Sequence, residues 1–157
     1  MVAIRRMDAR DLGEVADIWN PIIRESAVTF TDAPWSEAAL AEWLAAPGPR
    51  LVAAEGPGAV LGFAAAGLFR PGPGYRFTWE HTVHVAGAAR GRGLGRALMD
   101  ALAAELRTRG ARVMVGAVSA ENRRALAFHA RLGFAESGRL PGVGWKFGRP
   151  MDLVLLT

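Results

Sequence analysis

The feature that most constrains this chain is the stretch of residues 80–98, EHTVHVAGAARGRGLGRAL. It contains a short apolar strand at 82–85, a turn rich in Gly and Arg at 87–95, and the start of an amphipathic helix. A strand, a glycine-rich turn and a helix N-terminus together present backbone N–H groups and the positive end of a helix dipole to an anion. The pattern therefore predicts an anion-binding site at this junction.

The turn itself, RGRGLG, has neither the G-x-G-x-x-G spacing of dinucleotide-binding loops nor the Gly-Lys-Ser/Thr ending of nucleotide-triphosphate loops. Its glycines still allow close approach of phosphate oxygens, because no side chain stands in the way. Arg90, Arg92 and Arg96 add guanidinium groups that pair with phosphate through a planar fork. On spacing alone a second interpretation stays open, in which these residues form only a turn with a solvated edge.

Composition narrows the possible classes. The 157 residues predict one domain, spanning 1–157, with a single core. No apolar run approaches membrane-spanning length and MVAIRRMDAR is not a signal peptide, so the expected location is the cytoplasm. The absence of Cys excludes disulfides, thiolate metal sites and a cysteine nucleophile. The net charge of +4, almost wholly from Arg because Lys146 is the only lysine, suits a phosphorylated cofactor, nucleic acid or a mixed solvated surface.

Periodicity and turn residues predict a mixed α/β fold around one sheet, in the order β-α-α-β-β-β-α-β-α-β-β. A capping box of Asp8 and Asp11 opens the first helix, and Pro21 should bend or break that helix near Asn20. Ser36 and Asn122 are expected to cap later helices. The expected strands are 2–6, 50–54, 59–69, 76–85, 112–118, 134–140 and 150–156, and the expected later helices are 36–46, 94–109 and 122–132.

Residues 90–98, RGRGLGRAL, resemble the acetyl-CoA signature Gln/Arg-x-x-Gly-x-Gly/Ala of the GNAT superfamily of N-acetyltransferases. The predicted order of elements is also similar to that superfamily. The resemblance implies a mostly antiparallel sheet with helices on both faces, backbone amides of the turn that hold the CoA pyrophosphate, and a strand that pairs with the pantetheine. The cofactor-binding residues that it implies are Val83, His84, Val85, Arg90, Gly91, Arg92, Gly93, Leu94, Gly95, Arg96 and Asn122, with Arg131 as a further candidate for the ribose phosphate.

Scattered fragments between about residues 18 and 155, DIWNPII, VTFTDAP, YRFTWEHTVHV, FHARLGF and GWKFGRPMDL, resemble the phosphinothricin N-acetyltransferase-like subgroup. That resemblance implies acetylation of the α-amine of small amino-acid analogues such as phosphinothricin, methionine sulfoximine and methionine sulfone. Pro150, Ala125 and Phe128 depart from the subgroup pattern, which has Trp, Ser and Leu there. These departures bear on substrate identity more than on the reaction.

An amine must lose a proton before it attacks a thioester, so a general base is required. Glu80 lies just before the cofactor-binding segment, in a largely apolar neighbourhood that could raise its pKa. The E-x-T-V-x-V pattern of the subgroup implies that Glu80 is that base, acting through water. The alternative is an edge carboxylate in a surface ion pair.

His129 lies seven residues after Asn122, near the same face of the last helix. The resemblance implies that it protonates the leaving thiolate, where other superfamily members have a Tyr; the alternative is a structural His packed beside Leu132. His81 and His84 alternate faces on their strand, so only one is expected to point at the pocket. The three histidines lack metal-ligand spacing, and no metal is expected.

An amino-acid acceptor brings a carboxylate, onto which Arg70 or Arg76 could fork; the alternative for each is a solvated surface position. Aromatic residues could form the wall of the side-chain pocket, with core packing or a subunit contact as the alternative. The expected substrate-binding residues are Phe30, Arg70, Tyr75, Arg76 and Glu80, with Trp35 as a further wall residue. Trp19, Trp43 and Trp145 are expected to be structural.

The sequence thus favours an N-acetyltransferase that moves an acetyl group from acetyl-CoA to the α-amine of a small amino acid or analogue. A GNAT enzyme for another amine, such as a protein N-terminus or a polyamine, and a CoA-binding regulatory module without activity are alternatives. A nucleic-acid-binding domain would rest on the positive charge alone, without clustered basic residues and interleaved aromatics. The subgroup resemblance implies a homodimer, with residues 145–149 at the interface.

Overall fold

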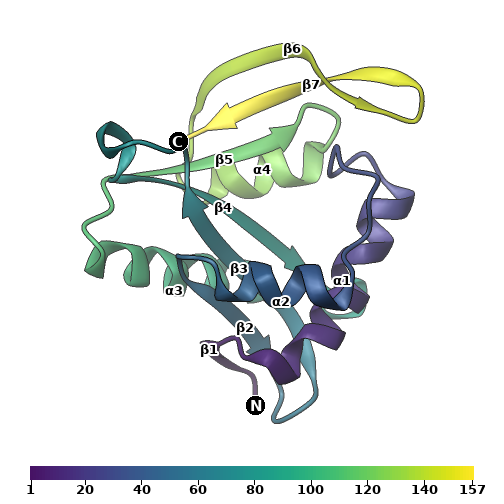
Figure 1. Ribbon diagram of the computed structural model, residues 1–157, viewed down its shortest axis with the longest axis vertical. Helices are drawn as coiled ribbons and strands as arrows, with labels where there is room; N and C mark the ends of the chain where they lie inside the picture. Colours follow the sequence, from purple (N-terminus) through teal and green to yellow (C-terminus); the bar gives the residue numbers. More distant parts are fainter.

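One seven-stranded sheet organises the protein, in the order β1-β2-β3-β4-β5-β7-β6 (Figure 1). The structure, a computed structural model, describes residues 1–157. Only β4 and β5 are parallel, and every other neighbouring pair is antiparallel. The strands are β1 (Ala3–Arg6), β2 (Arg50–Ala54), β3 (Val60–Leu68), β4 (Thr78–Val85), β5 (Val113–Ser119), β6 (Glu136–Lys146) and β7 (Arg149–Leu156). The predicted fold class, including the mostly antiparallel sheet, is confirmed.

Helices cover both faces of the sheet: α1 (Leu12–Glu25) and α2 (Glu37–Ala45) on one, α3 (Leu94–Thr108) and α4 (Arg123–Arg131) on the other. Strand β2 shows how the layers are sorted. Its Val52 and Ala54 pack in the cluster under α1 and α2, whereas Leu51 and Ala53 pack under α3. Because successive side chains point to opposite faces, a strand covered on both sides is apolar throughout. None of the helices is both long enough and apolar enough to span a bilayer.

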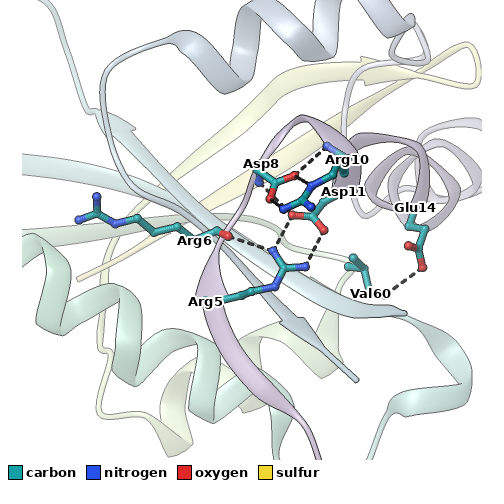
Figure 2. Close-up of polar contacts among 7 residues, drawn as sticks. All are labelled: Arg5, Arg6, Asp8, Arg10, Asp11, Glu14 and Val60. Atoms are coloured by element: carbon teal, nitrogen blue, oxygen red, sulfur yellow. Dashed lines mark hydrogen bonds and ion pairs between the residues drawn. The ribbon is translucent and has the colours of Figure 1, made fainter. Parts of the chain in front are cut away.

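The N-terminal capping box forms as predicted (Figure 2). Asp8 accepts a hydrogen bond from the backbone N–H of Arg10, and Asp11 accepts one from the backbone N–H of Asp8. Asp11 is only 3% exposed and takes both guanidinium nitrogens of Arg5, each at 2.8 Å. Nearby, Glu14 accepts from the backbone N–H of Val60 at 2.9 Å. These bonds tie β1, the start of α1 and β3 together.

Of the two outcomes predicted for Pro21, a bend or a break, the break is wrong, because α1 runs through Pro21 to Glu25. Proline removes one N–H donor, but Trp19 and Ile23 on either side are buried in the core. Helices in proteins owe most of their stability to such packing of an amphipathic face, and here it outweighs the missing bond.

Strand β6 is longer than predicted and continues to Lys146. The Pro141-Gly142 sequence reads as a strand end, but it is absorbed by a bulge, at which the register slips between Leu140 and Gly144. The tight turn between β6 and β7 uses Phe147 and Gly148, with φ of 53° and 72°. Two consecutive positive φ values match the right-handed twist of a two-residue hairpin.

The feature that positions the site is a gap between the two parallel strands. Their pairing runs from Thr78 opposite Val113 to His81 opposite Gly116 and then stops, while both strands continue. On its other edge β4 stays paired with β3 up to Val85. The last four residues of β4 therefore have one backbone edge without a strand partner, which is available to an extended ligand.

Candidate active site

The turn after β4 forms the predicted strand–turn–helix junction. Gly91 and Gly93 have φ of +78° and +76°, the left-handed region in which glycine costs least. Gly93 is the N-cap of α3, and no side chain caps that end. The first N–H groups of an α-helix have no intrahelical partners, so this end of α3 offers free donors and a positive dipole end.

A groove of about 1210 Å³ borders this turn. Its charged lining residues are Arg90, Arg96, Arg124 and Arg131, with Glu25 as the only acidic one. Such a lining suits an anion with several phosphate groups. The groove brings together all but one of the predicted cofactor-binding residues: Val83, His84, Val85, Arg90, Gly91, Gly93, Leu94, Gly95, Arg96 and Asn122, as well as Arg131. The exception is Arg92, which does not line the groove and instead pairs with Glu55 at 2.6 Å.

Helix α4 forms the opposite wall of the groove. Asn122 caps it as predicted, through a hydrogen bond from the backbone N–H of Ala125 to Oδ1, so the side-chain NH₂ stays available to a ligand. The ring of Phe128 fills the space above Gly95, where an added Cβ would lie 3.1 Å from the ring. Of the three departures from the subgroup pattern, Ala125 and Phe128 line this groove and Pro150 lies away from it on β7.

A smaller cavity of about 260 Å³ opens between the ends of β4 and β5. It shares wall residues with the groove, so the two form one continuous space. Its walls come from α1 and the loop after it, both parallel strands, α4 and β7. The lining includes Val28, Thr29, Phe30, His81, Thr82, Val83, His84, Gly116, Ser119, Asn122, Ala125 and His129. Of the aromatic residues predicted to form the wall of the substrate pocket, Phe30 alone lines this cavity.

Both His81 and His84 line this cavity, so the expectation that only one would do so is wrong. They do alternate faces, but the cavity lies between separated strands and is reached from both sides of the sheet. His84 lies near the rings of Trp19 and Phe63, at centroid distances of 5.9 and 5.5 Å. Burial, with a smaller contribution from Arg90, lowers the pKa of His84 to about 4.

His81 and His129 form a buried pair, with their Nε2 atoms 2.9 Å apart and side chains 7% and 4% exposed. The Nδ1 of His129 lies 2.7 Å from the carbonyl oxygen of Ala125, which only accepts, so Nδ1 carries a proton. In the neutral pair the Nε2 of His129 must then accept the N–H of His81. Gly116 makes room for this arrangement, because a Cβ there would lie 3.0 Å from the His81 ring.

The pair is uncharged at neutral pH. Burial and the proximity of His129 lower the pKa of His81 to about 4. Burial also lowers the pKa of His129, against the opposing effect of its bond to the Ala125 carbonyl. No three His, Asp or Glu side chains gather in a way that could hold a metal ion.

Glu80 lies on β4 on the same face as Thr82 and His84, next to Gly67 of β3 and Val115 of β5. It does not line the cavity, and its carboxylate makes no ion pair and no hydrogen bond within the chain. The side chain remains open to solvent, but neighbouring atoms displace enough water to raise its pKa. The surface ion pair that was its alternative interpretation is not present.

The other predicted substrate residues lie at the opposite end of β4. Arg76 donates to the carbonyl of Pro73 at 2.7 Å and stacks over Phe77, whereas Arg70 lies over Phe69. Tyr75 is exposed beside Phe69. Neither Arg70, Tyr75 nor Arg76 lines the cavity or the groove.

The predicted structural tryptophans divide into two groups. Trp19 is buried and also lines the small cavity, and Trp43 packs against it at 5.2 Å. Trp35, predicted as a wall of the pocket, lines neither the cavity nor the groove and packs against Trp19 at 4.9 Å. Trp145 is 67% exposed on β6 and is not part of the core of this chain.

Sequence reasoning missed the loop residues Val28 and Thr29, the strand residues Gly116 and Ser119, and Arg124. Arg124 could have been predicted as an anion-binding residue, because it lies two residues after Asn122 and places a basic side chain at the N-terminus of a helix. Val28 and Thr29 flank the predicted Phe30 in the VTFTDAP fragment. Gly116 and Ser119 carry no signal in the linear sequence, because the separation of β4 from β5 is what brings them to the cavity.

The model of the acetyltransferase (GNAT) family matches residues 17–134, about three quarters of the chain. The chain belongs to the GNAT family of acetyltransferases. Family membership confirms the predicted enzyme class and the predicted acetyl donor, acetyl-CoA.

Three relatives illustrate how far the similarity of this acetyltransferase extends. The L-methionine sulfoximine/L-methionine sulfone acetyltransferase of Pseudomonas paraeruginosa is 38% identical, over 98% of this chain and 92% of its own length. The phosphinothricin N-acetyltransferase of Alcaligenes faecalis is 37% identical, over 93% and 76%. The yncA protein of Salmonella typhimurium, solved with its cofactor acetyl-CoA, superposes with a TM-score of 0.93 at 34% identity, over 99% of this chain and 92% of its own.

Proposed function

We propose that this acetyltransferase acts on the α-amine of a small amino acid or analogue, of the phosphinothricin, methionine sulfoximine or methionine sulfone type. The observation that carries the proposal is the separation of β4 from β5, which makes one continuous space from the glycine-rich turn to a small cavity whose lining on β4 begins at His81, one residue after Glu80. A cavity of about 260 Å³ suits a small acceptor better than a long polyamine.

In this proposal the donor occupies the groove. The free N–H groups at the start of α3 hold the pyrophosphate, and Arg90, Arg96, Arg124 or Arg131 pair with its phosphates. The free edge of β4 at residues 82–85 accepts the pantetheine in the manner of an added strand. Because that edge leads from the groove into the cavity, the thioester would reach the cavity.

Glu80 acts as general base in this proposal, through a water molecule. It takes one proton from the acceptor ammonium, and the free amine attacks the thioester carbon. The C–N bond forms, the C–S bond breaks, the sulfur leaves with its electron pair as a thiolate, and the nitrogen loses its second proton to water. A raised pKa and the absence of a competing ion pair both favour Glu80 as a proton acceptor near neutral pH.

His129 is the proposed source of a proton for the thiolate, with a condition set by its hydrogen bonds. In the neutral pair each N–H already has an acceptor, the Ala125 carbonyl or the other ring. The pair must therefore take up a proton before His129 can donate one from Nε2.

The acceptor would lie with its amine between Glu80 and the cavity. Glu80 is two residues into β4, between the cavity and the loop that holds Arg70, Tyr75 and Arg76. The acceptor side chain would occupy the cavity, and its carboxylate would point out of the cavity toward the loop of those arginines, which themselves line neither space.

A homodimer is part of the proposal. Val143, Trp145 and Phe147, near the tip of the β6–β7 hairpin, are all more than half exposed. Neighbouring apolar side chains of this size on one hairpin are typical of a protein–protein contact.

An acceptor panel tests the proposal. Release of CoA thiol from acetyl-CoA is measured with methionine sulfone, methionine sulfoximine, phosphinothricin, spermidine and a peptide with a free N-terminus. Preference for the amino-acid analogues is expected. A preference for the peptide or spermidine would favour a GNAT enzyme of another amine, and CoA binding without turnover on any acceptor would favour a regulatory module.

A further inference from the structure

Lys146, the only lysine of the chain, is buried at 3% exposure near the end of β6. Its Nζ donates to the carbonyl oxygens of Ser26 and Thr29 at 2.7 and 2.8 Å, and to the Thr29 hydroxyl at 3.3 Å. No carboxylate lies within ion-pair distance of it. A buried ammonium is costly unless its donors are satisfied, and here all three acceptors belong to one loop, 117 to 120 residues away in sequence.

A second contact holds the same loop to the same strand. Gly144 lies two residues before Lys146, on the same face of β6. The ring of Phe30 occupies the space in which a Cβ on Gly144 would stand. The Ser26–Phe30 loop is therefore held to β6 at both its ends. The Lys146 ammonium binds its carbonyl groups, and the Phe30 ring packs against Gly144, which has no side chain to displace it.

This loop also forms one wall of the small cavity. Val28, Thr29 and Phe30 line the small cavity, across from the residues of β4 and β5. The loop has no helix or strand of its own between α1 and α2, so its position depends on such contacts. Ser26 and Val28 of this loop also line the larger groove, but the turn that would hold the donor phosphates lies on β4 and α3, away from Lys146.

We propose that Lys146 is a positioning residue for the acceptor, which fixes the Ser26–Phe30 loop as the wall against which the acceptor binds. The inference rests on the proposed function, because it takes the small cavity as the acceptor side. The affinity for the acceptor then depends on Lys146 more strongly than the affinity for acetyl-CoA does.

Lys146→Met tests this, because methionine keeps a long apolar stem and removes all three donors. With methionine sulfone as acceptor, its KM should rise about tenfold, since small displacements of a positioning group have effects of at least this size. The KM for acetyl-CoA should stay within about threefold. Lys146→Arg should restore the acceptor KM only in part, because a planar fork does not converge on three oxygens of one loop.

Leu40→Ala is the matched control for a merely structural role. Leu40 is buried on α2 and lines neither space, so this variant should lose stability without a change in the acceptor KM. An unchanged acceptor KM in Lys146→Met, or an equal rise in Leu40→Ala at matched stability, would overturn the inference. A wild type that acetylates nothing in the panel would instead refute the proposed function.

A measurement on the unaltered protein covers the case in which Lys146→Met does not fold. Labelling with ¹⁵N-lysine gives a single side-chain ammonium signal, because the chain has one lysine. Methionine sulfone should shift that signal in the presence of CoA, and CoA alone should shift it less. A signal that the acceptor leaves in place, in protein that turns this acceptor over, would contradict the inference.

Discussion

At the scale of single residues, the His81–His129 pair limits what His129 can do. Its Nδ1–H is bound to the Ala125 carbonyl, and its Nε2 accepts from His81 while both rings are neutral. Because the pKa values of both rings are lowered by burial, the pair gains a proton only at a pH below the ordinary histidine value of about 6.5. Any contribution of His129 as an acid must therefore be larger in acid than in alkali.

This sets a pH-dependent prediction for His129→Asn. The ratio of wild-type to variant kcat should be largest below about pH 6.5 and should fall toward one by about pH 8, as the pair loses its proton. The ratio cancels the protonation of the acceptor and of Glu80, which both enzymes share. A ratio that stays constant over this range would mean that His129 is structural.

Sequence reasoning placed His129 on the correct helix but did not find its partner. His81 lies 48 residues earlier and meets His129 across Gly116, which lacks the Cβ that would block the contact. Three separate facts create the pair: the register of β4 with β5, the missing side chain and the docking of α4. None of them is local in sequence.

At the scale of elements, the start of α3 should recognise the donor. Gly93→Ala should destabilise the protein by about 1 kcal/mol, because alanine is strained at a φ of +76°. It should also raise the KM for acetyl-CoA, because the strained N-cap would shift the N–H groups proposed to hold the pyrophosphate.

Gly110→Ala provides the control for this prediction at the other end of the same helix. Gly110 has a φ of +78° and its added Cβ would make only ordinary contact with Phe77. Urea unfolding should show a similar loss of stability for both variants, and steady-state kinetics should show the KM effect for Gly93→Ala alone. A KM effect of equal size in Gly110→Ala would trace it to general destabilisation.

The capping cluster before α1 gives a prediction about stability. Hydrogen bonding from Arg5, the largest cause, lowers the pKa of Asp11 in the folded protein. A lowered folded pKa means that this stabilisation is present above the unfolded value and is lost as pH falls through the folded value. Asp11→Ala should cost about 2 kcal/mol at pH 7, and the difference from wild type should narrow near pH 3.

Urea unfolding at the two pH values measures this, with Asp17→Ala as control. Asp17 is exposed on α1 and makes no side-chain hydrogen bond, so its removal should change stability little at either pH. A difference for Asp11→Ala that is as large at pH 3 as at pH 7 would argue against an ionised Asp11 as its cause.

Helices, strands and turns could be predicted where the local sequence signals agreed. The prediction failed where contacts between distant parts of the chain determine the structure. The glycine-rich turn, the caps at Asp8, Ser36 and Asn122, and the hairpin of β2 and β3 all follow from local chemistry. The extension of β6 does not. Its Pro141-Gly142 bulge depends on pairing with β7, where Asp152 accepts a hydrogen bond from the N–H of Gly142 at 2.8 Å.

At the scale of the whole molecule, the exposed face of the β6–β7 hairpin predicts association. Sedimentation velocity should show a dimer for the wild type and a shift to monomer for Trp145→Ala at the same concentration, because large aromatic residues dominate interface energies. Val113→Ala, an exposed apolar residue on β5, should leave the dimer intact. A monomeric wild type, or a variant that remains a dimer, would contradict this part of the proposal.

The overall architecture could be predicted from the sequence, because the predicted order of helices and strands and the resemblance of residues 90–98 to the acetyl-CoA signature both indicated the same fold. The site was accessible in part. Its donor side follows from one contiguous segment, but its acceptor side is assembled from the loop after α1, β6 and the gap between β4 and β5. That is why acetyl transfer was easier to predict than the residues that select the acceptor.

The most direct test of the central claim is the kcat/KM of Glu80→Gln for methionine sulfone across pH, beside wild type. Near pH 7 a loss of about 10²-fold or more is expected, shrinking at higher pH as the amine loses its proton without help. Glu42→Gln, which removes an exposed carboxylate on α2, should match wild type throughout. Equal rates for Glu80→Gln and wild type at every pH would show that Glu80 is not the base.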